Sequence, residues 1–346
     1  MRARFLNDRE KQGTRAFYES AFPEDSEEFV DFYYKWIVGR NDIFAVEEWE
    51  GDRAMVQAMV HINSHCLSIN GSRRNIPYLV AVATRPDCRR QGKMRYLLEN
   101  ALMDMHRRQY AFAFLMPANP AYYTGLGFRY FPCQPAGKEG AFGGSFPGMS
   151  WRNAETGDIG RMCAFANQVL GQEYQISVYW DDAYCRRLFA EAAAGQGGVM
   201  LLESQDGLQG ILVYGLSPEG EGKGSAEIKD LLLDRGLPLN RQAQIGLCQA
   251  ALPGYAIDFP PMDMMVRILS IAQFVPLIRS QKERTLYVDI EDPILPSNCG
   301  YFQITLGPQG SRASRIPRTG SGQKMDIAGL AQVLLADVPV AIREWV

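Results

Sequence analysis

The sequence predicts an α/β (α+β) fold made of two copies of one unit followed by a smaller segment. The first observation is an order of helix, helix, hairpin, strand and helix that occurs in residues 1–132 and again in residues 151–261. The second is residues 133–150, which are rich in Gly and Pro, lack periodicity and indicate a linker. The third is residues 262–346, where short strands alternate with helices. We therefore expect two α/β domains, a linker between them and a C-terminal α+β domain.

The first unit begins with two expected helices. Residues 8–21 carry apolar positions at helical spacing, and the helix ends there because Pro23 removes the next amide donor. A second helix opens with clustered acids, which favour a helix N-terminus, and Gly39 stops it. A hairpin and a further strand are expected at residues 43–49, 54–62 and 66–69. The unit ends with an apolar strand, a basic loop, a helix and a second strand, at residues 78–84, 85–94, 93–108 and 110–116.

The second unit repeats this order without a basic loop. Its helices, hairpin and strand are expected at residues 155–170, 181–194, 199–216 and 226–233, with a last helix over 239–250. The loop before that last helix carries a single base, Arg235, so no anion site is expected there. No final strand is evident before Pro260. In the C-terminal segment we expect strands at 264–270, 285–290 and 301–306, and helices at 271–278 and 326–335.

Composition argues against several classes of protein. The 346 residues carry a formal charge of −3, whereas a general nucleic-acid binder has a broad basic excess. No apolar run is long enough to span a membrane, and the N-terminus lacks the apolar stretch of an export signal. Seven scattered cysteines without a C-x-x-C pair indicate reduced thiols and a cytoplasmic protein. His61 and His65 are expected on strands, where they do not share the face that a helical metal pair needs, so no metal site is expected.

The basic loop is the first candidate site. In Arg89-Arg90-Gln91-Gly92-Lys93-Met94, Gly92 lets the backbone approach a pyrophosphate, and the next amides are unpaired donors of a helix start. Five basic side chains add a local positive field: Arg85, Arg89, Arg90, Lys93 and Arg95. A basic helix start without a ligand is the alternative. The segment Tyr123-Thr124-Gly125-Leu126-Gly127-Phe128 follows at strand–helix–strand spacing, and this context favours a ligand site.

This combination resembles the GNAT acyltransferase superfamily. The strand and loop match V/L-A-T-x-P-x-x-R-R-x-G, the pattern of the acetyl-CoA loop, and the tyrosine segment matches Y-x-x-x-G-F. Met94 replaces the usual small residue, a departure shared with the Eis-like (enhanced intracellular survival) branch. The resemblance to that branch extends over the whole chain. It implies tandem GNAT folds, of which the second is degenerate, a C-terminal domain similar to sterol carrier proteins (SCP2-like), and a homo-oligomer that is a hexamer.

The resemblance also implies roles that suit transfer of acetyl from a thioester to an amine. Acetyl-CoA would be bound by backbone groups of the strand end for pantetheine and of the loop for pyrophosphate, namely Val82, Ala83, Thr84, Arg89, Arg90, Gln91, Gly92, Lys93 and Met94. Tyr123 corresponds to the tyrosine that protonates the departing sulfur, with simple packing as the alternative. The C-terminal carboxylate, here on Val346, would receive the proton of the amine, and a frayed terminus is the alternative.

The acceptor site is implied on the segment that borders the acceptor pocket in GNAT proteins. Asp25, Glu28, Phe32 and Trp36 lie there, and acids with aromatics suit a cationic amine such as an aminoglycoside, a polyamine or a lysine side chain. A helix first turn with a core stripe explains the same residues. The sequence therefore predicts an acetyl-CoA-dependent N-acetyltransferase that acts on a primary amine in a ternary complex. The alternative is a catalytically inactive acyl-CoA-binding or regulatory protein that keeps the fold.

Overall fold

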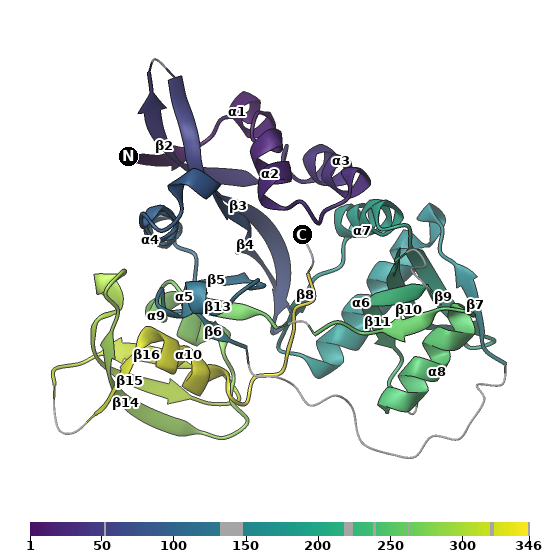
Figure 1. The fold of residues 1–346 in the computed structure, drawn as a ribbon. Coiled ribbons are helices and arrows are strands. Elements are labelled where there is room, and N and C mark those ends of the chain that lie inside the picture. Colours follow the sequence, from purple (N-terminus) through teal and green to yellow (C-terminus); the bar gives the residue numbers. More distant parts are fainter. Residues whose placement is uncertain are drawn as a thin grey trace.

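The computed structural model describes residues 1–51, 53–131, 148–217, 224–237, 240–261, 263–318 and 322–344. Its strands form three sheets, of nine, five and four strands. Figure 1 shows the long strands of the first sheet in the centre, the second sheet at the right and the third at the lower left.

The first sheet collects strands from all three predicted segments. Its main order is β1-β2-β3-β4-β5-β13-β6, and β8 pairs with both β3 and β18. The members are β1 (Arg2–Phe5), β2 (Asp42–Glu50), β3 (Arg53–Ile69), β4 (Ser72–Thr84), β5 (Phe112–Leu115), β6 (Arg129–Tyr130), β8 (Ile176–Val178), β13 (Met265–Ile268) and β18 (Val340–Ala341). The strand that the sequence assigned to the start of the C-terminal segment, β13, thus lies inside the first sheet, antiparallel to β5 and β6. All four of its residues are buried, which explains this position between two other strands.

Helices cover both faces of this sheet. They are α1 (Asp8–Gln12), α2 (Arg15–Ala21), α3 (Glu27–Trp36), α4 (Lys93–Arg107) and the short α5 (Ala121–Thr124), with a 3-10 turn at Pro86–Cys88. The single helix expected over residues 8–21 is two helices, because the chain turns at Gly13, the C-cap of α1. Buried side chains of α2 and α3 pack with Ile43, Met59 and Ala81, whereas those of α4 pack with Val60 on the opposite face.

The third strand is longer than predicted. The sequence suggested separate strands at residues 54–62 and 66–69, but β3 runs through 17 residues. Its partner β4 explains the continuity, because the ladder extends from Asn63 opposite Tyr78 to Ile69 opposite Ser72. The two strands are joined at Asn70 and Gly71, whose φ angles of 49° and 78° form a tight hairpin turn.

The second sheet confirms the repeated order of elements. It runs β12-β11-β10-β9-β7. Its elements are β7 (Ser150–Asn153), α6 (Ile159–Glu173), α7 (Asp182–Ala194), β9 (Gly198–Ser204), β10 (Gly207–Ser217), β11 (Ser225–Leu233), α8 (Arg241–Ala251) and β12 (Ala256–Asp258), with a 3-10 turn at Thr156–Asp158. The expectation of no strand before Pro260 was wrong, because β12 pairs in parallel with β11. With only three residues, β12 is too short to leave a period in the sequence.

The third sheet, with order β16-β15-β14-β17, forms the C-terminal α+β layer. Its elements are α9 (Ile271–Phe274), β14 (Arg284–Glu291), β15 (Gly300–Leu306), β16 (Arg312–Arg315), β17 (Gln323–Asp326) and α10 (Ile327–Leu335), with 3-10 turns at Val275–Leu277 and Pro296–Asn298. A fully buried ion pair connects this layer to the first sheet, where Arg267 Nη2 on β13 lies 2.7 Å from Asp292 Oδ1. Among the described helices, none is long and apolar enough to cross a membrane.

Candidate active site

A bulge interrupts the ladder between β3 and β4. Met59 faces Ala83 and His61 faces Val80, so Val60 alone lies opposite Ala81 and Val82. Ala81 has a φ of 50°, a left-handed conformation that costs a non-glycine residue about 1–2 kcal/mol. Such an outlier persists only where the surrounding structure holds it, and it often marks a functional site. The sequence does not predict this conformation, because position 81 is an Ala and not a Gly or Asn, the residues that favour it.

Beyond the point where they pair, β4 and β5 separate. In the described residues their ladder has one paired position, Tyr78 with Phe114. The strand end that follows, Val82 to Thr84, therefore lacks a partner on the β5 side. This is the edge that the sequence assigned to the pantetheine amides, and an unpaired strand edge offers N–H and C=O groups to an extended amide ligand.

The basic loop lies at the open end of this gap. Arg90 and Gly92 have φ angles of 60° and 75°, which turn the chain sharply before α4 begins at Lys93. No intramolecular acceptor is recorded for the amides from Arg90 to Arg95 in the described part of the chain. Arg89, Arg90, Gln91 and Gly92 are exposed. Free amides on a left-handed turn and at a helix N-terminus form an anion-binding concavity.

Two loop residues have side chains that pack inside the protein. Lys93 is 5% exposed, and its Nζ lies 2.5 Å from Glu48 Oε2 on β2, so its charge is compensated inside the protein. Met94 is half-buried and packs against the core beneath α4. Arg89 and Arg90 are therefore the guanidinium groups of this loop that extend into solvent.

Tyr123 on α5 lies beside the gap. Its ring is 6% exposed and packs in the same apolar cluster as Leu79 of β4 and Leu115 of β5. Phe128 holds it edge-on, with 5.9 Å between ring centroids. The hydroxyl has no recorded hydrogen-bond partner among the described residues. Burial, with a smaller effect of Tyr122, raises the pKa of Tyr123 to about 12, so the phenol is protonated at neutral pH.

Packing explains why the tyrosine motif has a glycine at position 127. Gly127 has a φ of 85°, and a Cβ there would lie 2.8 Å from Arg267 Nε and 2.9 Å from Ile327 Cγ2. Arg267 Nε donates to the carbonyl of Leu126 at 2.7 Å, so the buried guanidinium fixes the turn that follows Tyr123. The missing side chain of Gly127 therefore lets β13 support the tyrosine segment.

The residues predicted for the acceptor site separate in the structure. Trp36 lines a cavity of about 230 Å³ between α3, β3 and the start of α7. Phe32 is buried in the core under α3, and Glu28 is exposed. Asp25 accepts a hydrogen bond from the Tyr18 hydroxyl at 2.7 Å, and burial raises the pKa of its carboxyl. Of the four, Trp36 is the one that borders this cavity.

This cavity lies next to the gap between β4 and β5. His65 lines it, and its ring centroid is 5.3 Å from that of Tyr78, the residue at which the two strands part. Tyr184 and Arg187 of α7 form the opposite wall. A concave site with aromatic walls and few charged groups suits a small ligand. The sequence missed His65 and Arg187, which come from different domains.

The last described residues approach the same place. Tyr78 donates from its hydroxyl to the carbonyl of Glu344 at 3.3 Å. Val346, the predicted carrier of the accepting carboxylate, lies outside the described residues.

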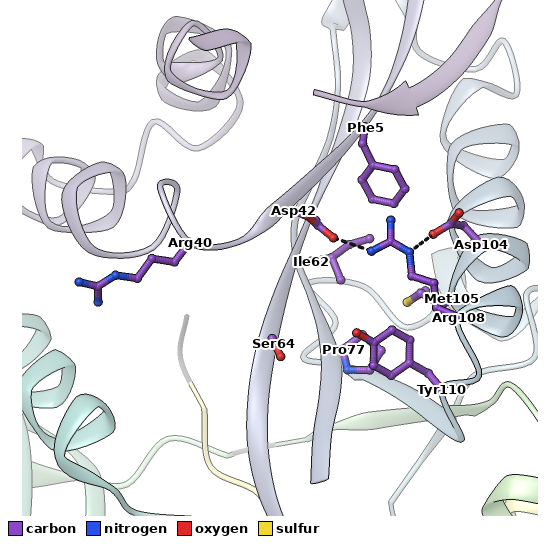
Figure 2. A pocket seen from close by; sticks show the side chains of 10 residues that line it. All are labelled: Phe5, Arg40, Asp42, Ile62, Ser64, Pro77, Asp104, Met105, Arg108 and Tyr110. Atoms are coloured by element: carbon purple, nitrogen blue, oxygen red, sulfur yellow. Dashed lines mark hydrogen bonds and ion pairs between the residues drawn. The ribbon is translucent and has the colours of Figure 1, made fainter. Parts of the chain in front are cut away.

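A second, smaller cavity of about 110 Å³ lies on the other side of the sheet, near the end of α4. Figure 2 shows the Arg108 guanidinium filling its centre, with Phe5 above the group and Asp42 and Asp104 on either side. Arg40, although it borders this cavity, points away from the other labelled side chains, and its guanidinium carbon lies 5.7 Å from the centroid of the Trp36 ring. Because both acids are committed to Arg108, we assign no ligand here. Within the described ranges no group of three His, Cys, Asp or Glu residues is arranged to hold a metal ion.

Residues 2–131 match the family of acetyltransferase (GNAT) domains. The bulged strand, the amide-rich loop and the tyrosine segment all lie within this match. The first unit therefore matches GNAT domains over nearly its whole length.

Solved structures with a similar fold cover almost the whole chain. A conserved protein of unknown function from Enterococcus faecalis, described as a probable N-acyltransferase, has a TM-score of 0.70 at 15% identity, with 100% of this chain and 99% of that chain covered. A GCN5-related N-acetyltransferase from Kribbella flavida has a TM-score of 0.71 at 14% identity, with 100% and 98% covered. Eis1 from Mycobacterium abscessus has a TM-score of 0.66 at 14% identity, with 97% and 90% covered.

These similarities confirm the predicted fold class, tandem GNAT-type α/β units with an additional α+β domain. Among curated proteins no match was found.

Proposed function

We propose that the protein is an acetyl-CoA-dependent N-acetyltransferase that modifies a primary amine. The observation that carries this proposal is the parting of β4 and β5 at Tyr78, with the amide-rich loop at the open end and Tyr123 packed beside it. An acyl-CoA thioester needs these three features together. Its pyrophosphate requires amide donors, its pantetheine a free strand edge, and its sulfur a proton source.

The residues available fit such a ligand. The amides from Arg90 to Met94 would bind the pyrophosphate, with Arg89 and Arg90 adding charge from solvent. Val82, Ala83 and Thr84 would pair with the pantetheine, and the bulge at Ala81 would turn the strand towards the thioester. Bound acetyl-CoA supplies the activated acyl group, so the protein has to align an amine and provide a proton.

Tyr123 would act as the general acid. The amine nitrogen attacks the thioester carbonyl carbon, the carbon–sulfur bond breaks, and the phenol proton passes to the sulfur. Burial raises the pKa of Tyr123, and burial would also raise the pKa of the CoA thiol at the same place. The two pKa values therefore shift in the same direction, which keeps proton transfer from the phenol to the sulfur feasible. The attacking amine loses a proton, which the sequence-based prediction assigns to the Val346 carboxylate.

The acceptor would enter through the cavity lined by Trp36. Its aromatic rings suit an amine with an apolar or cationic body, but the charges of its lining are mixed, because Arg40 and Arg187 line it together with Asp181. Asp25 and Glu28 are absent from its described lining. An aminoglycoside, a polyamine and a lysine peptide therefore all belong in the test panel.

The test is release of free thiol from acetyl-CoA in the presence of each amine, with mass spectrometry of the acetylated product. Turnover with one class of amine supports the proposal. Tight CoA binding without turnover for any amine would instead favour a catalytically inactive acyl-CoA-binding protein. The family resemblance adds two expectations, a homohexamer and a C-terminal domain similar to sterol carrier proteins, and the cysteine pattern adds a cytoplasmic location. Light scattering on the purified protein tests the first.

A further inference from the structure

The Glu344 carboxylate is buried where three parts of the protein meet. Its side chain is 2% exposed. Oε2 lies 2.9 Å from Nδ1 of His65 on β3, and Oε1 lies 2.8 Å from Nη2 of Arg187 on α7. Glu344 belongs to the C-terminal segment, His65 to the GNAT domain and Arg187 to the second unit. Burial alone would raise the pKa of this carboxyl, but Arg187 and His65 outweigh burial and lower the pKa to about 2.

The second unit anchors this group more deeply. Arg187 also lies 3.3 Å from Glu191 Oε2, and Lys229 of β11 lies 3.3 Å from Glu191 Oε1. The buried cations and carboxylates therefore alternate from the chain end into the second sheet. Removing one member leaves a buried charge without its partner, which is strongly destabilising. Replacing a whole buried ion pair by apolar residues of similar volume, in contrast, is often neutral or stabilising.

The main chain before Glu344 is held separately. Val340 and Ala341 pair in parallel with Ile176 and Ser177 of β8, which itself pairs with the end of β3. The ladder fixes the direction of the segment, but it ends before residue 342. From there the chain is held by the buried side chain of Ile342, by the Glu344 side chain and by the Tyr78 hydroxyl, which donates to the Glu344 carbonyl.

His65 and Arg187 also line the cavity next to the parting of β4 and β5. We propose that Glu344 is a positioning residue, which His65 and Arg187 hold so that the C-terminal segment closes one side of the acceptor cavity and aligns the amine with the thioester. This inference rests on the proposed acetyltransferase function. It assigns to the ion cluster a role in orienting the acceptor, in addition to joining the domains.

The experiment uses the full chain and two variants. Glu344→Gln removes the charge, and the double variant Glu344→Gln/Arg187→Met removes both opposite charges while Lys229 still faces Glu191. We expect kcat/KM for the acceptor to fall about 10- to 100-fold in both, because a displacement of about 1 Å can cost that much. The KM for acetyl-CoA should stay unchanged, and amide hydrogen exchange should rise in residues 340–344.

The double variant separates positioning from stability. If it regains both the melting temperature and the acceptor kcat/KM of the wild type, the cluster is structural only and the proposal fails. Unchanged exchange in residues 340–344 would also overturn it. The control is Glu291→Gln, which breaks an exposed ion pair of 3.6 Å with Lys324 and should change none of these readouts. A wild type inactive towards every amine would refute the proposed function, whereas the exchange measurement would still decide whether Glu344 holds the segment.

Discussion

Replacing Tyr123 by Phe removes one oxygen atom from the proposed active site. The phenyl ring would keep its edge contact with Phe128 and its place in the cluster with Leu79. Because the hydroxyl has no recorded partner among the described residues, its loss leaves no donor or acceptor unsatisfied. We therefore expect the free energy of unfolding to change by less than about 0.5 kcal/mol, as for a substitution that disturbs no packing or buried polar contact.

The effect on catalysis should be much larger. General acid catalysis by a positioned side chain contributes about 10²- to 10⁴-fold in rate. Loss of the Tyr123 proton should therefore lower kcat at least ~100-fold, which corresponds to about 2.7 kcal/mol in the activation free energy. The dissociation constant of CoA should not change, because the loop amides and the strand edge are untouched.

The assay compares thiol release, CoA binding by calorimetry and urea unfolding for three proteins. They are the wild type, Tyr123→Phe and the matched control Tyr122→Phe. Tyr122 is 59% exposed and one residue away, so its hydroxyl should be dispensable. A folded Tyr123→Phe variant with wild-type kcat would remove Tyr123 as the acid. Equal losses in both variants would point to a general disturbance of α5.

Three further predictions concern the loop, the core and pH. Arg90→Ala should raise the KM for acetyl-CoA about tenfold, which corresponds to the loss of one charge-assisted contact, and should leave the melting temperature unchanged. The control is Arg95→Ala, because Arg95 is paired with Glu99. Equal KM values for the two variants would contradict a role of Arg90 in phosphate binding. Gly127→Ala should lower the free energy of unfolding in urea by more than about 2 kcal/mol, because the positive φ is unfavourable for Ala and the new Cβ would collide with Arg267. At Gly125 a Cβ meets open space, so Gly125→Ala should hardly change the free energy of unfolding. Burial lowers the pKa of His61 to about 3, below its unfolded value of about 6.5, so stability should fall as pH drops from 6.5 towards 3, by at most about 1.4 kcal/mol per pH unit. Unfolding free energies that do not depend on pH in this window would contradict the last prediction.

Local signals in the sequence account for part of the candidate site. The glycine of the basic loop, the apolar strand before it and the tyrosine motif all act within a few residues, and the structure has the expected strand, turn and helix there. Even so, the sequence did not tell which groups of the loop are available. Lys93 reads as one more base of the loop, but its side chain turns inward to Glu48, which is 45 residues away in the chain.

Other features depend on contacts that no local pattern records. The bulge at Ala81 exists because, between the same two paired positions, β4 has one residue more than β3. The alternation of Val and Ala in β4 is regular on both sides of the bulge, so the sequence of β4 alone does not indicate it. Arg187 and Glu344 are 157 residues apart, and each belongs to a segment with an ordinary helical or extended pattern. Phe32 and Trp36 lie one turn apart on the same face of α3, yet Phe32 is buried in the core, whereas Trp36 is only partly buried against the same cluster and borders the cavity.

The position of β13 has a consequence for how the protein is made. During synthesis the GNAT domain leaves the ribosome long before Met265 does, and until then β5 has no neighbour on the side that β13 will occupy. An open strand edge whose four residues, Phe112 to Leu115, are all buried in the finished protein is a site for aggregation. We expect a fragment that ends at residue 131 to be poorly soluble, and nascent chains of that length to depend on chaperones. The proposed active site would thus become complete only after β13 has been translated.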